Sequence, residues 1–500
     1  MKEMSNDDYH PEPVSWRRRI AMMLGGLVAL VLVAHLAWTM VAVGNLRKRV
    51  AQLRAQGEPV LPADFMSPAA ADEADNGGAD VDAAVELAAA YRAAHAQFDE
   101  LEAALPLRPE ERQVIEAAVQ ADLGGALSLL DRARAKPRLE TRLDLTSPVF
   151  NNLMLTSMND QRGLVRALGA ASLLDHANGD HAAALARLDR VLFVSRYLYK
   201  HPTIVGHLVA VGSSALASQH AIELAPDLRI GTGKGDIPPE ELRKLIDVLL
   251  DDAPYQAGLR LAFRGERMAQ LDAMTALDTG IPIAIGLTPG GGKTRYNAAM
   301  RYAIRPVLQT NARFMLDQMT VMLAAADGAD LPAAQAKLPT RPPRGTNPLR
   351  VFADILLPAL PRVLETHHRE RSERRLAAAA LAVRWYAVEH EGRLPGRLDD
   401  LVPRYLPAVP VDPLIGGGAR ISYKPAATQP ILYGVGTNNV DDGGSEAFIK
   451  PPSDGRAPGR GDEWLTRDRV VHLQRRPRPE PLPLPVDAPL DGAVPPPAGR

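Results

Sequence analysis

Apolar residues recur at three- and four-residue spacing from about residue 81 to residue 391, which is the period of a helix that packs one face on a core. Clusters of Pro, Gly and Asp interrupt this pattern, so we expect helices joined by short turns. The pattern predicts helices over residues 81–104, 109–135, 160–177, 181–199, 203–224, 238–250, 255–277, 295–326 and 369–391. Residues 81–327 are the predicted helical domain, and the Pro-rich, basic segment 328–348 is a predicted connector.

The C-terminal part of the chain has a different pattern. Short runs of Ile, Val and Tyr between Pro and Gly predict strands at 420–424, 430–436 and 464–473. With the helix before them, these strands form a predicted unit, residues 349–473, with a short antiparallel sheet. Residues 474–500 are Pro-rich and cannot bury a core, so we expect a disordered tail. The expected fold is mainly α with a small α+β C-terminal unit.

The first apolar run of the chain is long enough to cross a membrane. No residue from Ile20 to Val43 is charged, and these 24 residues would span roughly 36 Å as a helix, against about 30 Å of hydrocarbon. Residues 1–19 are a polar leader, and His35 is expected to stay neutral within the run. A cleaved signal peptide is the alternative, although the run is long for one.

Basic residues lie on both sides of this run, so charge alone does not decide its orientation. A short polar leader before a first apolar helix is the usual arrangement of a signal anchor. We therefore expect a single-pass protein of the inner (cytoplasmic) membrane, with the leader in the cytoplasm and the C-terminal bulk extracytoplasmic. The basic residues are Lys2, Arg17, Arg18 and Arg19 before the run, and Arg47, Lys48, Arg49 and Arg54 after it.

Residues 44–80 are a predicted stalk and acidic linker. Leu46, Val50 and Leu53 continue the helix with one apolar face, which suits either a short amphipathic stalk or a dimer contact. Gly57 is expected to end this helix.

Composition excludes several kinds of partner and site. The net charge of −1 gives no general attraction to nucleic acid or acidic lipid. The absence of cysteine excludes disulfides, thiolate nucleophiles and Cys-based zinc sites.

The run Gly290–Thr294 imitates the end of a phosphate-binding loop. That motif requires a glycine with four residues between it and the Gly-Lys-Thr, and Leu287 occupies the position here. We therefore expect no nucleotide binding and a flexible loop before the next helix.

The remaining polar clusters predict no catalytic residue. Glu365, His367 and His368 fall near a helix start, where adjacent side chains point about 100° apart, so we expect a solvated polar face and no metal site. The run Gly212–Ser214 lies in an apolar helical context, which favours close helix packing.

The most specific segment is residues 376–449. It begins with an amphipathic helix and passes through a Leu-Pro turn and an Asp-Pro to two short strands and an Asn/Asp/Gly loop. The corresponding runs are Leu376-Ala-Ala-Ala-Ala-Leu-Ala-Val-Arg-Trp-Tyr, Glu391-Gly-Arg-Leu-Pro, Val411-Asp-Pro, Ile421-Ser-Tyr-Lys and Leu432-Tyr-Gly-Val-Gly-Thr-Asn-Asn-Val-Asp-Asp-Gly-Gly. This order is similar to the C-terminal part of type II secretion major pseudopilins. The whole chain resembles a poorly characterised bacterial family of single-pass membrane-anchored proteins that carry the same tail.

Two features depart from the pseudopilin pattern. The N-terminus lacks a prepilin cleavage site, so we do not expect the chain to be processed or polymerised as a pilin. Leu414 stands where the family usually has an aromatic residue after Asp-Pro.

Pseudopilins of this type hold calcium in the matching loop, so the resemblance implies a calcium site at Asn438, Asn439, Asp441 and Asp442. Carboxylate and amide oxygens are the ligands that calcium prefers, and Asp412 is expected to come close to them. The alternative is a plain turn, in which Asn and Asp side chains cap their own backbone.

The sequence thus predicts architecture and location more closely than activity. We expect a membrane-anchored extracytoplasmic scaffold or binding protein of the cell envelope, with envelope protein partners and a link to a secretion or pilus-like system. The alternative is an envelope enzyme, such as a hydrolase, whose site is too dispersed to see in the sequence.

Overall fold

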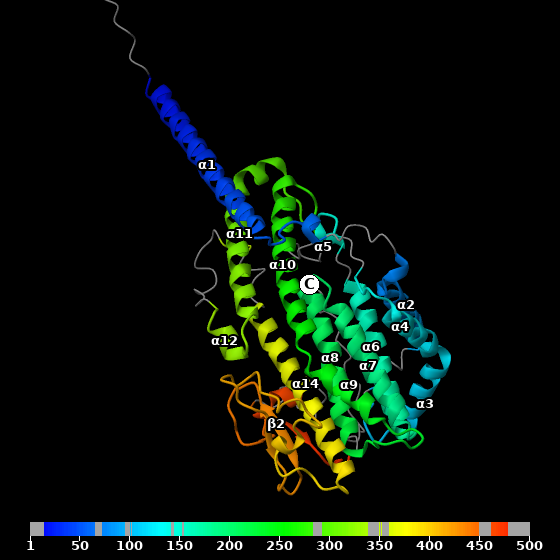
Figure 1. Cartoon of the computed structure of the whole chain (residues 1–500). Helices are drawn as coiled ribbons and strands as arrows, with labels where there is room; N and C mark the ends of the chain where they lie inside the picture. The colour runs from blue at the N-terminus through cyan, green and yellow to red at the C-terminus, as the bar shows by residue number, and fades with distance from the viewer. Residues whose placement is uncertain are drawn as a thin grey trace, which may run out of the picture.

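The computed structural model describes residues 15–65, 73–95, 101, 103–141, 145–152, 155–283, 293–338, 350, 352, 360–449 and 462–478. The protein is mainly helical, with one three-stranded antiparallel sheet, as the hydrophobic pattern predicts (Figure 1). The longer helices are α1 (Trp16–Ala55), α2 (Gly78–Ala94), α3 (Pro109–Ala118), α4 (Gly124–Ala135), α6 (Leu155–Ala177), α7 (His181–Leu198), α8 (Ile204–Leu224), α9 (Pro239–Leu250), α10 (Ala253–Thr279), α11 (Ala298–Ala326) and α14 (Leu360–Glu389). Short helices α5 (Val149–Asn152) and α12 (Leu331–Gln335) lie between them.

Helix α1 is one continuous helix of 40 residues that has two different surroundings. Its first part is apolar and exposed on all sides, and it is the one helix of the described residues that is long and apolar enough to cross a membrane. Its last part lies against α11 (Figure 1). The predicted run from Ile20 to Val43 is therefore contained in a longer helix that continues into the body.

The predicted stalk is a packed part of the body. Leu46 and Leu53 are buried in a hydrophobic cluster with residues of α10 and α11, and Val50 packs at its edge. Arg49 donates from Nε to the Asp317 carboxylate at 2.7 Å. The sequence allowed two interpretations of this apolar face, a short stalk or a dimer contact. In the structure the face packs against helices of the same chain.

The segment after α1 is tied to α10 by charge. Gly57 has a φ of +76°, a conformation that glycine adopts without strain, and it ends the helix as expected. The Glu58 carboxylate accepts from Arg264 at 2.9 Å and from Arg267 at 2.8 Å. The hydrogen bond from Arg264 holds the pKa of Glu58 below its usual value, against the opposite effect of burial.

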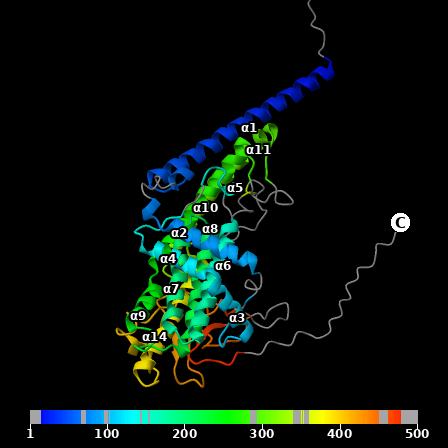
Figure 2. The same ribbon diagram turned by 90° about the vertical axis from the view of Figure 1, so that its right-hand side faces the viewer.

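Helices α6, α7 and α8 pack on one another, and α2, α3 and α4 cover their outer side (Figure 2). The turn between α6 and α7 uses Gly179, with a φ of +82°, and Asp180, whose carboxylate accepts from the Ala183 amide at 3.0 Å and so caps α7. Helix α14 lies on the other side of α8 and also contacts α9.

The middle of α14 is buried on every side. Leu376 through Val383 belong to the same hydrophobic cluster as α2, α6, α7, α8 and α9. Parts of the predicted helical domain (81–327) and of the predicted C-terminal unit (349–473) therefore share one hydrophobic cluster.

The sheet lies at the end of α14 that is far from α1 (Figure 1). Its strands are β1 (Ser422–Lys424), β2 (Ile431–Val435) and β3 (Asp468–His472), in the order β1-β2-β3. The register places Tyr433 opposite Ser422 on one side and Val470 on the other. Strand β2 is buried along its whole length and packs on α14.

The C-terminal tail begins later than predicted. Arg478 pairs with Glu111 at 2.6 Å, and Arg475 pairs with Asp227, so residues 474–478 lie on the helical body. The prediction that disorder begins at residue 474 is wrong for these residues, because it considered Pro content and overlooked the arginines. The rest of the predicted tail, and residues 339–348 of the predicted connector, lie outside the described residues.

Candidate functional site

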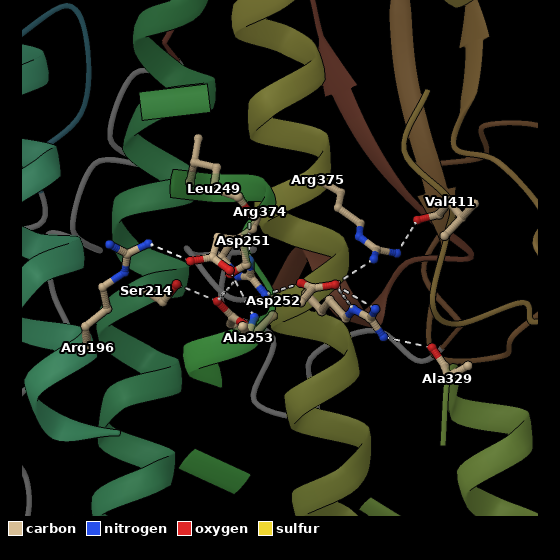
Figure 3. Close-up of polar contacts among 12 residues, drawn as sticks. Arg196, Ser214, Leu249, Asp251, Asp252, Ala253, Ala329, Arg374, Arg375 and Val411 are labelled. Carbon is tan, nitrogen blue, oxygen red and sulfur yellow. Dashed lines mark hydrogen bonds and ion pairs between the residues drawn. The ribbon is translucent and has the colours of Figure 1, made fainter. Parts of the chain in front are cut away.

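The first half of α14 carries charged side chains into the protein interior. Glu370, Glu373 and Arg374 are 2%, 1% and 0% exposed. Burial of an unpaired charge is very costly, so each of these groups must have partners that replace water. Their contacts define the candidate site, which we call the α14 charge cluster: Glu370, Arg371, Glu373, Arg374 and Arg375 with their partners. Figure 3 shows the part of this cluster around Arg374, Arg375 and Asp252.

Arg374 is the centre of this cluster. Its guanidinium donates to the Glu370 carboxylate, the Leu249 carbonyl and the Asp252 carboxylate, at 2.8, 2.7 and 2.8 Å. It also lies over the ring of Tyr255, 3.7 Å from the centroid. The bond to Leu249 places a cation at the C-terminal end of α9, where the helix dipole favours it. One side chain thus joins α14 to α9 and to the start of α10.

Asp252 is the anion that this arginine shares with two others. Its carboxylate accepts from Arg371 at 2.6 Å and from Arg375 at 2.8 Å, in addition to Arg374. Burial alone would raise the pKa of Asp252, but the three arginines outweigh it and hold the pKa below its usual value. The carboxylate therefore stays ionised and bridges consecutive turns of α14.

The outer two arginines also bond to backbone carbonyls of two other segments, after α11 and before β1 (Figure 3). Arg375 donates to the carbonyl of Val411 at 2.8 Å, in the loop before β1. Arg371 donates to the carbonyl of Ala329 at 2.8 Å, at the end of α11. These bonds fix two chain connections relative to α14.

A second buried pair attaches the sheet. Arg469 on β3 donates from two nitrogens to Glu373, at 2.9 and 2.6 Å, which is the two-pronged geometry that Arg makes with carboxylates. The preceding residue, Ser372, faces Asp412, whose carboxylate accepts from the amides of Leu414 at 3.0 Å and Val435 at 2.8 Å. Burial raises the pKa of Asp412 despite these bonds.

The histidines of α14 are buried, so the predicted solvated polar face is wrong. His367 lies with its ring centroid 5.4 Å from that of His207 on α8 and 5.6 Å from that of His368. Burial lowers the pKa of His207 to about 3 and that of His368 to about 4, so these rings are neutral at physiological pH. Neither ring nitrogen of His207 has a hydrogen-bond partner among the described residues.

The expected close packing of the Gly212–Ser214 run holds for Ser213 and Ser214, which are buried, and is wrong for Gly212, which is exposed with no neighbouring atom within 4 Å of where a Cβ would lie. Ser214 is buried at the contact of α8 with α14 and donates its hydroxyl to Glu370. Burial raises the pKa of Glu370, while Arg374 and Ser214 act in the opposite direction.

The four predicted calcium ligands lie together in one loop, but much of their bonding is internal. Asn438 donates to the Asp442 carboxylate at 2.6 Å, and the Asp441 carboxylate accepts from the Gly443 amide at 2.9 Å. Asn439 has a φ of +56°. Arg467 also pairs with Asp442, at 3.2 Å. Such bonds resemble those of the plain turn.

The loop is organised by Asp468, a residue that the sequence did not reveal. Its buried carboxylate accepts from the amides of Asp442, Gly444 and Ser445, at 3.2, 2.8 and 2.9 Å. Asp412, which was expected nearby, instead binds the amides of Leu414 and Val435. In the described part of the chain no three His, Asp or Glu residues are grouped as metal ligands, and calcium binding stays a prediction.

The nucleotide-like run is only partly described. Gly290–Gly292 lie outside the described residues, Lys293 is exposed, and Thr294 forms a backbone bridge with Ile283. The absence of nucleotide binding stays a prediction.

A surface recess of about 350 Å³ lies between the C-terminal end of α8 and β3. Its lining carries both signs of charge, including Glu223, Glu446, Arg469, His472 and Arg476. A second recess of about 250 Å³ adjoins it and shares Pro226, Gln474 and Arg475.

Comparison with known proteins identifies no relative: no family model, no curated protein and no solved structure matches this chain.

The cluster predicts a large effect of removing its central cation. Arg374→Leu should lower the free energy of unfolding by about 3–5 kcal/mol, because it leaves the buried Glu370 carboxylate without its arginine and removes one of the three arginines that pair with Asp252. Arg313→Leu is the matched control, since Arg313 is half-exposed and pairs with Asp317 at 3.8 Å within one helix; we expect a loss of under about 1 kcal/mol. Denaturation of the full chain in detergent measures both. Equal losses would contradict a central role for Arg374.

The buried histidines predict a loss of stability in mild acid. Because burial lowers the pKa of His207 in the folded state from 6.5 to about 3, the unfolded chain binds more protons below pH 6.5. Stability is therefore full above pH 6.5 and falls as pH falls, by about 2–3 kcal/mol for this residue at about pH 4.5.

His207→Leu should reduce the slope of unfolding free energy against pH by about one proton in this range. Ser218→Ala, a change at a buried, non-titrating position of the same helix, is the control and should leave the slope unchanged. A slope that is identical in wild type and His207→Leu would show that this ring does not titrate on unfolding.

Proposed function

We propose that this protein is a single-pass, membrane-anchored scaffold or binding protein of the cell envelope, with its body outside the cytoplasm. The observation that carries the proposal is the continuity of α1. Its exposed apolar part leads without a break into a part that is buried against α11. A helix of this kind connects a bilayer rigidly to a folded body.

The contacts of α1 favour a retained anchor over a cleaved signal peptide. The His35 ring donates from Nε2 to the Tyr302 carbonyl at 2.9 Å, and Ala42 is buried. Cleavage after Ala42 or Gly44 would remove these contacts and uncover one side of α11. A signal peptide is removed from the mature protein, so the mature fold does not depend on contacts with it.

The α14 charge cluster supports a structural role more than a chemical one. Its charged groups are buried and engaged with one another and with backbone carbonyls, so little of their bonding capacity is left for a substrate. A hydrolase would need comparable groups at a place that water and substrate reach. This favours the scaffold over the envelope enzyme.

The recess beside β3 is the surface that we assign to partner binding. Its volume of about 350 Å³ suits a few side chains of a protein segment, and its mixed charges suit a polar one. One side of it is formed by Glu446 and β3 of the pseudopilin-like unit, which supports the proposed link to a secretion or pilus-like system.

Because the chain has no cysteine, single cysteines report topology without interference. In intact spheroplasts, a membrane-impermeant maleimide should label the exposed position in Val440→Cys and should not label Ser5→Cys in the leader until the cells are lysed. The leader should also remain on the mature chain. The opposite labelling pattern, or loss of the leader, would contradict the proposal.

Partner binding predicts site-specific cross-linking. A photo-reactive amino acid in place of Gln474, which is exposed in both recesses, should give discrete protein adducts in intact cells. The same substitution at Lys244, which is exposed on α9, should not. Adducts of equal yield at both positions, or at neither, would contradict a binding role for the recess.

A further inference from the structure

The start of α11 lies beside the apolar part of α1. His35 contacts Tyr302 through the hydrogen bond of 2.9 Å, and their ring centroids are 4.8 Å apart. Further along, Arg49 pairs with Asp317. The two contacts are separated by 14 residues on α1 and 15 on α11 (49 − 35 and 317 − 302), so the helices run side by side in the same direction for roughly 21 Å (Figures 1 and 2).

The position of His35 sets the depth of this contact. His35 lies 8 residues before Val43 (43 − 35), which is roughly 12 Å along the helix. The uncharged run of roughly 36 Å exceeds the hydrocarbon thickness of about 30 Å by about 6 Å. If the excess lies at the N-terminal end of the run, His35 is about 12 Å inside the hydrocarbon boundary, and if it lies at the C-terminal end, His35 is about 6 Å inside. Tyr302 contacts His35 and therefore lies about 6–12 Å inside this boundary, close to the 5–10 Å depth of interfacial helices.

The end of the α10–α11 hairpin exposes apolar side chains at this level. Ile281, Met300 and Tyr302 are 42%, 47% and 50% exposed. Backbone hydrogen bonds of 3.0 and 2.8 Å between Ile283 and Thr294 join the segment after α10 to the segment before α11. Tyrosine, with an apolar ring and a polar hydroxyl, is typical of the membrane–water boundary.

The charges around these side chains suit a lipid surface. Lys293 and Arg295 are exposed, and cations of this kind are attracted to anionic headgroups. Arg301 directs its guanidinium to the carbonyls of Asp278 and Thr279 at the end of α10, and Arg305 pairs with Asp278 at 3.3 Å. The cations nearest the apolar side chains therefore have partners within the protein.

We propose that the α10–α11 tip, formed by Ile281, Lys293, Arg295, Met300 and Tyr302, is a second membrane contact. It inserts beside α1 into the headgroup and upper acyl region of the leaflet from which α1 emerges, and its partner is an anionic phospholipid bilayer. This inference rests on the proposed membrane anchor. Two contacts instead of one would fix the orientation of the body relative to the membrane.

Spin labels on single cysteines in the full-length protein test this inference. The protein is placed in nanodiscs of phosphatidylethanolamine and phosphatidylglycerol, and collisions of each label with oxygen and with a water-soluble nickel chelate are measured. Met300→Cys should be accessible to oxygen and several-fold less accessible to nickel than Val440→Cys, which is exposed on the distant loop. Leu27→Cys on α1 reports the anchor itself.

The three labels separate failure of the inference from failure of the anchor. If Leu27→Cys is in lipid and Met300→Cys is as accessible to nickel as Val440→Cys, the second contact is absent and the anchor stands. If Leu27→Cys is itself accessible to nickel, the anchor fails and the inference fails with it. If Met300→Cys is shielded from both reagents, protein covers the tip, which also overturns the inference.

Lipid charge gives an independent readout. In nanodiscs of phosphatidylcholine alone, nickel accessibility at Met300→Cys should rise, because Lys293 and Arg295 lose their anionic partners. An unchanged accessibility would overturn the role assigned to these two cations.

Discussion

The burial of Arg374 is the constraint on which the arrangement of the helices depends. A guanidinium has five donors and keeps its charge at any physiological pH, so it can be buried only where acceptors surround it. Here the acceptors come from the end of α9, from Asp252 and from Glu370. They converge only when α9, α10 and α14 hold the observed positions, and a shift of any one helix would leave a buried charge unpaired.

The other charges of α14 hold the sheet in place, and helix packing connects α10 to α1. Glu373 holds β3 through Arg469, and Arg375 holds the loop before β1. In the opposite direction, α10 packs on α11, and α11 packs on α1. The apolar helix and the sheet are thus at opposite ends of one continuous series of packed helices.

The local pattern predicted most of the secondary structure, because a helix face repeats at a fixed period whatever it packs against. Helix α7 was expected over 181–199 and is found over His181–Leu198, and α9 was expected over 238–250 and is found over Pro239–Leu250. The partners of these helices could not be predicted. Asp252 is 122 residues before Arg374, and Arg469 is 96 residues after Glu373.

The errors have the same origin. His367 and His368 look like a solvated face because a run of charged residues is usually exposed, yet here both are buried. The one sequence signal was the apolar residues that follow, Leu376 to Val383, which leave no polar face and indicate a helix buried on all sides. Asp468 was missed because its role depends on the folding of β3 beside the loop.

We infer that the charges of α14 make the sheet and the helical body one cooperative unit. Amide hydrogen exchange of the full-length protein tests it most directly, because it measures the free energy of opening at each position. We expect equal opening free energies for Leu432 and Val471 in the sheet and Val209 and Ala210 in α8, and an equal decrease at all four positions in Glu373→Gln. A sheet that opens at lower free energy than α8, with only its own protection reduced by Glu373→Gln, would contradict it.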